Sequence, residues 1–133
     1  MNAFIVDLKN KPAELAKVAE AIAEKGIDIT GFSGSTFGDS GTLTLVTDNE
    51  VATRRVLTDG AWKFHTIEVV EASLPNKPGT LAEAARRLAK AGVNIEAAFP
   101  TGMAGSGVHI VFATDNPAKA RQALAEPVGA TSR

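Results

Sequence analysis

The segment NKPGTLAEAARRLAKAGVNI, residues 76–95, follows the same pattern as NKPAELAKVAEAIAEKGIDI, residues 10–29. The two segments align without a gap at an offset of 66 positions, and nine of their twenty positions are identical. A second pair, TDNEVATRRVL from Thr47 and TDNPAKARQAL from Thr114, aligns at an offset of 67. A period this long that occurs twice indicates a duplicated supersecondary unit rather than a solenoid.

The first copy alternates between strand and helix periodicities. After Pro12, Leu15, Val18, Ala19 and Ile22 recur at the helical spacing of a core-facing stripe, while Glu14 faces water. Gly26 is a typical residue for ending that helix. Asn49 can cap a second, shorter helix. The pattern predicts strands at 3–8, 27–37, 42–47 and 62–70, and helices at 12–25 and 49–57. This order, β-α-β-β-α-β, is the ferredoxin-like motif.

The second copy predicts the same order without a linker. Its expected strands are 69–74, 93–99, 108–114 and a short closing strand near Val128, with helices at 78–91 and 117–125 and with Leu81, Ala85 and Leu88 facing inward. A unit of about 65 residues buries too little surface to be stable alone. We therefore expect an α+β fold in which two such modules, 1–66 and 67–133, pack side by side. The expected sheet is antiparallel with about eight strands, and its helices lie on one face.

Composition restricts the classes of function. Of 133 residues, 44% are hydrophobic and 22% charged, cysteine is absent and the net charge is −1, which is typical of a globular protein. The sequence does not show the cluster of basic residues that would be typical of a nucleic-acid-binding surface. No apolar run approaches the roughly 18 residues of a membrane span, and no signal-peptide pattern opens the chain. We expect a cytoplasmic protein that binds neither nucleic acid nor membranes.

The chain lacks the usual patterns of catalysis. His65 and His109 are the two histidines, they lie in alternating strands, and no pair of histidines has the spacing of metal ligands. Gly31-Phe32-Ser33 does not continue as a nucleophile elbow, and the glycine-rich run 102–107 lacks the ending of a phosphate loop. We expect no enzyme activity, no cofactor and no metal.

The block LPNKPGTLAEAARRLAKAGVNIEAAF in the second copy resembles the ACT domain family. ACT modules join a first strand, a Pro-Gly turn, an amphipathic helix and a Gly-Val/Ile-Asn-Ile segment that begins the second strand. Here these are Pro78-Gly79, residues 80–91 and residues 92–95. The first copy matches more weakly. The whole chain is similar to small stand-alone proteins built from two ACT modules.

The resemblance implies regulatory binding of a small molecule, typically an amino acid, between two modules. The strand-to-helix turn of one module would then meet the start of the second strand of the other. One implied site joins Asn76, Lys77, Pro78 and Gly79 with Asp28. The other joins Asn10, Lys11, Pro12 and Ala13 with Asn94.

The chemistry of these residues fits such a ligand, and a structural interpretation fits as well. The first turn of a helix offers unpaired N–H groups to a carboxylate, and Gly79 allows close approach. An asparagine amide can serve either a carboxylate or an ammonium. Alternatively, Asn10 and Asn76 only cap the following helices, and Asn94 only satisfies local backbone groups. Ala13 in place of glycine and Asp28 in place of asparagine predict that the two sites differ.

Three hypotheses of function follow. The first is a non-enzymatic sensor that binds a free amino acid between its modules. The second is a regulatory subunit that binds an enzyme of amino-acid metabolism, with or without a ligand of its own. The third, a small enzyme on a ferredoxin-like scaffold, has the least support because no acid–base or nucleophile constellation is present. Unprotected edge strands also lead us to expect a homo-oligomer.

Overall fold

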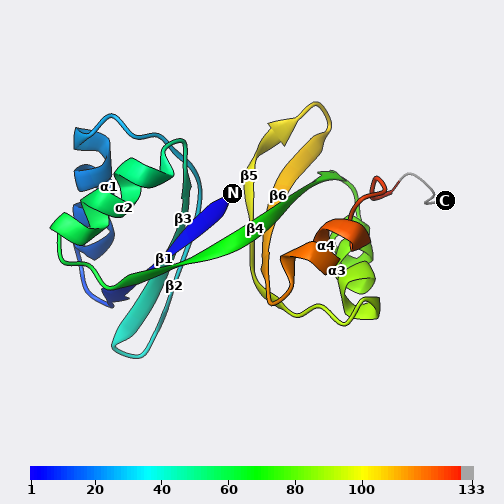
Figure 1. Ribbon diagram of the computed structural model, residues 1–133, viewed down its shortest axis with the longest axis horizontal. Coiled ribbons are helices and arrows are strands. Elements are labelled where there is room, and N and C mark those ends of the chain that lie inside the picture. Colours follow the sequence, from blue (N-terminus) through cyan, green and yellow to red (C-terminus); the bar gives the residue numbers. More distant parts are fainter. Residues whose placement is uncertain (130–133) are drawn as a thin grey trace. The chain divides into compact units, whose positions relative to one another are not determined.

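The computed structural model describes residues 1–129 and shows an α+β fold (Figure 1). Its elements are β1 (Asn2–Lys9), α1 (Glu14–Glu24), β2 (Ile29–Phe37), β3 (Ser40–Thr47), α2 (Glu50–Asp59), β4 (Phe64–Pro75), α3 (Thr80–Lys90), β5 (Ile95–Ala104), β6 (Gly107–Thr114) and α4 (Pro117–Ala123). The chain forms two compact units. The first is Asn2–Ile67, and the second is Met1 with the residues from Glu68 onward.

The first unit is a split β-α-β sheet covered by helices. Its strands follow the order β2-β3-β1 and then the beginning of β4, and β3 pairs antiparallel with both of its neighbours. Leu45 of β3 stands between Phe4 of β1 and Phe32 of β2 in the register. Helices α1 and α2 lie next to each other on one face of this sheet (Figure 1). The order of elements predicted for the first copy is confirmed.

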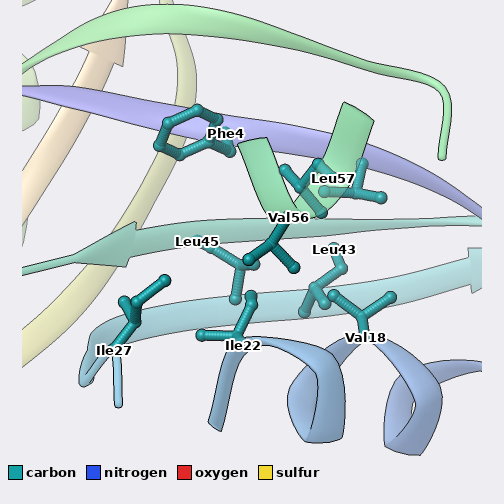
Figure 2. Close-up of a cluster of buried hydrophobic side chains, with 9 residues drawn as sticks. Phe4, Val18, Ile22, Ile27, Leu43, Leu45, Val56 and Leu57 are labelled. Carbon is teal, nitrogen blue, oxygen red and sulfur yellow. The ribbon is translucent and has the colours of Figure 1, made fainter. Parts of the chain in front are cut away.

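The core of the first unit lies between that sheet face and the two helices. Figure 2 shows Val18 and Ile22 of α1 pointing toward Leu43 and Leu45 of β3. The cluster consists of Phe4, Val6, Val18, Ile22, Ile27, Leu43, Leu45, Val56 and Leu57. Alternate residues of the strands and residues four apart on α1 supply it, which is the pattern expected of half-buried elements.

The second unit has the strand order β4-β6-β5, again antiparallel, with α3 and α4 adjacent. Its core contains Val70, Leu74, Ala84, Leu88, Val93, Phe112, Ala120 and Val128. Asn49 and Asn116 cap α2 and α4, because their side-chain oxygens accept from Ala52 N–H at 3.0 Å and Lys119 N–H at 3.1 Å. The cap predicted for Asn49 is therefore confirmed.

The prediction of eight strands is wrong, since the described residues contain six. Two strands were expected at 62–70 and 69–74, but β4 runs through both without a break. Its sequence FHTIEVVEASLP contains no glycine, and its proline comes last, so nothing in it interrupts the extended chain.

No strand forms near Val128 either, because helix α3 holds this segment. The guanidinium of Arg87 donates to the carbonyl oxygens of Glu126 at 2.6 Å and Pro127 at 3.1 Å. Arg87 also pairs with Glu83 at 2.7 Å, and Glu83 accepts from Gly129 N–H at 3.2 Å. These two hydrogen-bond partners, Gly129 first and then Arg87, lower the pKa of Glu83. Val128 is 4% exposed and fills the core without pairing.

The inward orientation expected for the first-turn leucines is also wrong. Leu15 is 51% exposed and Leu81 is 58% exposed, although Val18, Ile22 and Leu88 further along the helices are buried. Both leucines line open pockets at the start of their helices, where the core does not reach. Among residues 1–129 there is no helix long and apolar enough to cross a membrane.

Candidate functional site

Both units build the same strand-to-helix turn, and the chain takes an unusual backbone conformation in each. Helix α1 follows Ala13, whose φ is 74°, and helix α3 follows Gly79, whose φ is 92°. These values lie in the left-handed region, which glycine adopts easily and alanine only at a cost. Neither helix has a side-chain cap on its first turn. The first N–H groups of both helices therefore have no side-chain acceptor.

Each turn is tied to the tip of the hairpin in its own unit. Asn10 N–H donates to the carbonyl of Asp39 at 3.0 Å, and Asn10 Nδ2 donates to the carbonyl of Gly38 at 2.9 Å. In the second unit, Asn76 N–H donates to the carbonyl of Ser106 at 3.0 Å. The alternative that Asn10 and Asn76 cap the helices is wrong. Their backbones fix the turn to the hairpin instead.

An open pocket of about 370 Å³ lies at the turn of the first unit. It is lined by Leu8, Lys9, Asn10, Lys11, Glu14, Leu15, Phe32, Gly34, Ser35, Thr36, Gly41, Thr42 and Leu43. Small-molecule pockets span roughly 300–1,000 Å³, so this volume fits a small ligand. Two of the predicted site residues, Asn10 and Lys11, are in its wall. Pro12 and Ala13 follow them in the turn.

Charges of both signs lie at the mouth of this pocket. Glu14 accepts a hydrogen bond from Lys17 Nζ at 3.2 Å, and Lys11 is in the same turn. The Lys17 ammonium is the main cause that lowers the pKa of the Glu14 carboxyl below its ordinary value. Glu14 therefore keeps its negative charge beside the apolar side chains of the pocket.

A second hollow, of about 200 Å³, adjoins this pocket and shares three of its lining side chains, those of Leu15, Phe32 and Leu43. The side chains of its lining are all apolar and belong to Leu15, Ala19, Ile29, Phe32, Leu43 and Leu45. Phe32 is 60% exposed, which is unusual for a side chain of this size. The charged pocket and the apolar hollow thus meet at the side chains of Leu15, Phe32 and Leu43.

The turn of the second unit has a smaller pocket, of about 270 Å³. Its lining comprises Leu74, Pro75, Asn76, Lys77, Gly79, Thr80, Leu81, Val108 and Ile110, and contains no carboxylate. Thr80 stands where the first unit has Glu14, and its hydroxyl donates to the carbonyl of Pro75 at 2.8 Å. The predicted residues Asn76, Lys77 and Gly79 lie together here, with Pro78 between them. The two turns therefore differ in charge.

Asp28 and Asn94 occupy matching places immediately before β2 and β5, with exposed side chains. Asp28 N–H donates to Asp48 Oδ1 at 3.0 Å, and Asn94 N–H donates to Asp115 Oδ1 at 2.9 Å. Local contacts thus use the backbone of both residues and leave their side chains facing solvent. Each predicted site joins one of these residues to the turn of the other unit, and that pairing stays a prediction.

Some residues of the first pocket were missed by sequence reasoning. Glu14 reads as a solvated helix residue and Phe32 as an ordinary strand residue, and Leu15 was assigned to the core. Leu15 and Phe32 are far apart in the sequence and meet only through the fold. The available signal was the difference between the copies, since Ala98 and Thr80 replace Phe32 and Glu14 at an offset of 66.

Replacing Gly79 by alanine and Ala13 by glycine should affect the free energy of unfolding differently. A methyl group at Gly79 would meet no atom within 4 Å, so Gly79→Ala should cost only the left-handed backbone, about 1–2 kcal/mol of unfolding free energy. Ala13→Gly relieves that strain but adds chain entropy, so we expect a change between zero and about 1 kcal/mol of stabilisation. Urea unfolding of both variants checks this, and equal losses in the two would contradict the assigned conformations.

The described residues contain no group of three or more His, Asp or Glu side chains placed to hold a metal ion. Ser73 Oγ and His109 Nδ1 lie 2.9 Å apart across the β4–β6 pair, on an exposed part of the sheet. This pair lies outside the lining of both turn pockets.

Comparison with solved structures shows the fold. A Bacteroides thetaiotaomicron protein matches with a TM-score of 0.83 and 25% identity, over 93% of this chain and 85% of that one. The ligand-free regulatory subunit of aspartate kinase from Thermus thermophilus matches with a TM-score of 0.69 and 17% identity, over 93% and 89%. The corresponding subunit from Thermus flavus matches with a TM-score of 0.63 and 18% identity, over 93% of this chain and 90% of that one. The chain has the fold of these regulatory subunits.

Comparisons by sequence add no relative. No family model matches the chain. No curated protein matches it either.

Proposed function

We propose that this protein is a non-enzymatic regulator that binds a free amino acid at a strand-to-helix turn. The observation that carries the proposal is the first turn itself. Its uncapped helix start, its two charge signs and its pocket of about 370 Å³ occur together. A free amino acid presents a carboxylate and an ammonium next to each other. The first turn of a helix and Lys11 suit the carboxylate, and Glu14 suits the ammonium.

Membership of the ACT family is part of this proposal. It is supported by the Pro78-Gly79 turn, by the segment 92–95, and by the fold shared with aspartate kinase regulatory subunits. The boundary at 66/67 and the pairing of each turn with Asp28 or Asn94 remain predictions, as do self-association and a cytoplasmic location. An enzyme is not proposed, because no catalytic constellation was found in the sequence.

Thermal unfolding against each of the twenty amino acids at millimolar concentration tests the proposal. A ligand at about 100 times its dissociation constant adds roughly 2.7 kcal/mol to the stability of the folded state. For a chain of this length we expect the midpoint to rise by several degrees with one or a few related amino acids. If none of the twenty raises it, amino-acid binding is refuted.

Variants then test the turn-to-strand pairing. Asn94→Ala removes an exposed amide that the proposed pairing would use, and Glu96→Ala, two residues further on, is the matched control. We expect Asn94→Ala to weaken the shift and Glu96→Ala to leave it unchanged. Equal shifts in both variants would remove Asn94 from the site.

A second candidate function is favoured by the structural likeness. The Thermus thermophilus protein is a regulatory subunit of aspartate kinase, and the fold match covers 93% of this chain. The chain could thus serve as the regulatory subunit of an enzyme of amino-acid metabolism without a ligand of its own. Stable co-purification of such an enzyme, combined with no amino-acid shift in the isolated chain, would favour this function over the first.

A further inference from the structure

We infer that the first unit, and not the second, holds the ligand, and that the ligand is an α-amino acid with an apolar side chain. This inference rests on the proposed function and adds to it the occupied pocket and the class of ligand. It follows from the pocket and the hollow of the first unit, which share the side chains of Leu15, Phe32 and Leu43. The charged groups of the pocket and the apolar walls of the hollow recognise different parts of such a ligand.

The charged end recognises the part that all amino acids share. Lys11 and Glu14 lie in the lining of one pocket. Glu14 uses Oε2 for Lys17, and a carboxylate accepts several hydrogen bonds, so it can also receive an ammonium. A ligand that carries only one of the two charges would interact with only one of these two groups. The mouth therefore favours a zwitterion over an amine or a carboxylic acid.

The apolar end selects the side chain. The hollow that begins at Leu15, Phe32 and Leu43 contains only apolar side chains in its lining. A leucine, isoleucine, valine or phenylalanine side chain gains free energy when it leaves water and is buried against such walls. A polar side chain would lose its hydration without finding a hydrogen-bond partner. Leu15 and Phe32, both more than half exposed, would themselves be covered by the ligand.

The second pocket has an apolar wall of Leu74, Leu81, Val108 and Ile110, but it lacks the carboxylate and the phenylalanine of the first. Its described lining has Lys77 but no carboxylate, because Thr80 replaces Glu14 and directs its hydroxyl to the carbonyls of Pro75 and Lys77. The strand residue matching Phe32 is Ala98, which does not appear in the lining. An ammonium would find no anionic partner there. The difference between the copies is therefore a difference in ligand binding.

Titration calorimetry with leucine, phenylalanine, threonine, aspartate and lysine tests the ligand class. The same experiment with isoamylamine and 4-methylpentanoate, each of which lacks one charge of leucine, tests whether the pocket recognises both charges of the ligand. We expect leucine or phenylalanine to bind at least tenfold more tightly than the polar amino acids and than both analogues. Tighter binding of threonine, aspartate or lysine would overturn the inference and leave the proposed function standing. No binding of any amino acid would refute the proposed function itself.

Matched variants test the location. Leu15 and Leu81 hold the same place in the two copies and are similarly exposed, so Leu15→Ser and Leu81→Ser should perturb folding alike. Glu14→Gln removes the charge at the mouth, and Glu20→Gln removes an exposed charge on the same helix outside the pocket. We expect Leu15→Ser and Glu14→Gln to weaken binding at least tenfold, and both controls to change it less than twofold. Weakening by Leu81→Ser instead would place the ligand in the second unit and overturn the inference.

Discussion

Replacing Phe4 by alanine should lower the free energy of unfolding by about 3–5 kcal/mol, the cost typical of truncating a buried aromatic ring. Phe4 is 1% exposed and belongs to the core shown in Figure 2. Its ring lies 6.0 Å from that of Phe64, and the Arg54 guanidinium stands 5.9 Å from the Phe4 ring and 5.8 Å from the Phe64 ring. The alanine variant loses the buried area, the aromatic pair and one cation–π contact. Urea denaturation with an unchanged slope measures the loss.

Phe37 provides the matched control for Phe4. It undergoes the same chemical change in Phe37→Ala, but it is 89% exposed at the end of β2. We expect its substitution to stay within about 0.5 kcal/mol of the parent. A conservative Phe4→Leu should cost much less than Phe4→Ala, since most of the volume is kept. Similar losses at Phe4 and Phe37 would contradict the assigned core.

Thr47→Val should destabilise the protein and Thr114→Val should not, although the two threonines end equivalent strands. Thr47 Oγ1 lies 2.7 Å from Thr53 Oγ1 and accepts from Asn49 N–H at 3.3 Å. Thr53 Oγ1 in turn donates to the carbonyl of Asn49 at 2.8 Å, which closes a ring of hydrogen bonds. Thr47→Val opens this ring in a buried place and should cost about 1–3 kcal/mol.

In the second unit the same ring cannot form. Ala120 stands where the first unit has Thr53, and the buried Thr114 Oγ1 has no hydrogen-bond partner among the described residues. Thr114→Val keeps the shape and removes an unsatisfied hydroxyl, so we expect between no change and about 1 kcal/mol of stabilisation. Urea unfolding of both variants is the measurement. A loss at Thr114 as large as that at Thr47 would show that the Thr114 hydroxyl is bonded.

Most of the fold could be predicted because the sequence contains the same pattern of elements in two copies. The repeated segments fixed the order of elements in the first unit, and Asn49 marked the beginning of α2 through a residue type that caps helices. The prediction failed where no local signal exists. The two expected strands at 62–74 are one strand because no glycine or internal proline interrupts the extended chain. The closing strand is absent because Arg87 and Glu83 hold the chain near Val128, and such contacts have no sequence pattern.

The candidate site could be predicted only in its backbone frame. The turns at Asn10–Ala13 and Asn76–Gly79 were predicted from the resemblance to ACT modules, and both line or border pockets. The positions of the Glu14, Leu15 and Phe32 side chains, which give the first pocket its charge and its apolar wall, could not be predicted from the sequence. Whether Leu15 faces the core or an open hollow depends on how far the core extends, and sequence periodicity is the same in both cases.

Amide chemical-shift mapping with leucine titrated into the isotope-labelled chain tests the central claim most directly. We expect saturable shifts for residues 9–15 and 32–36, which contribute to the first pocket, and much smaller shifts for residues 76–81. Binding at the first turn would be contradicted if the spectrum stayed unchanged with leucine and with every other amino acid, or if the largest shifts lay at residues 76–81 or away from both turns.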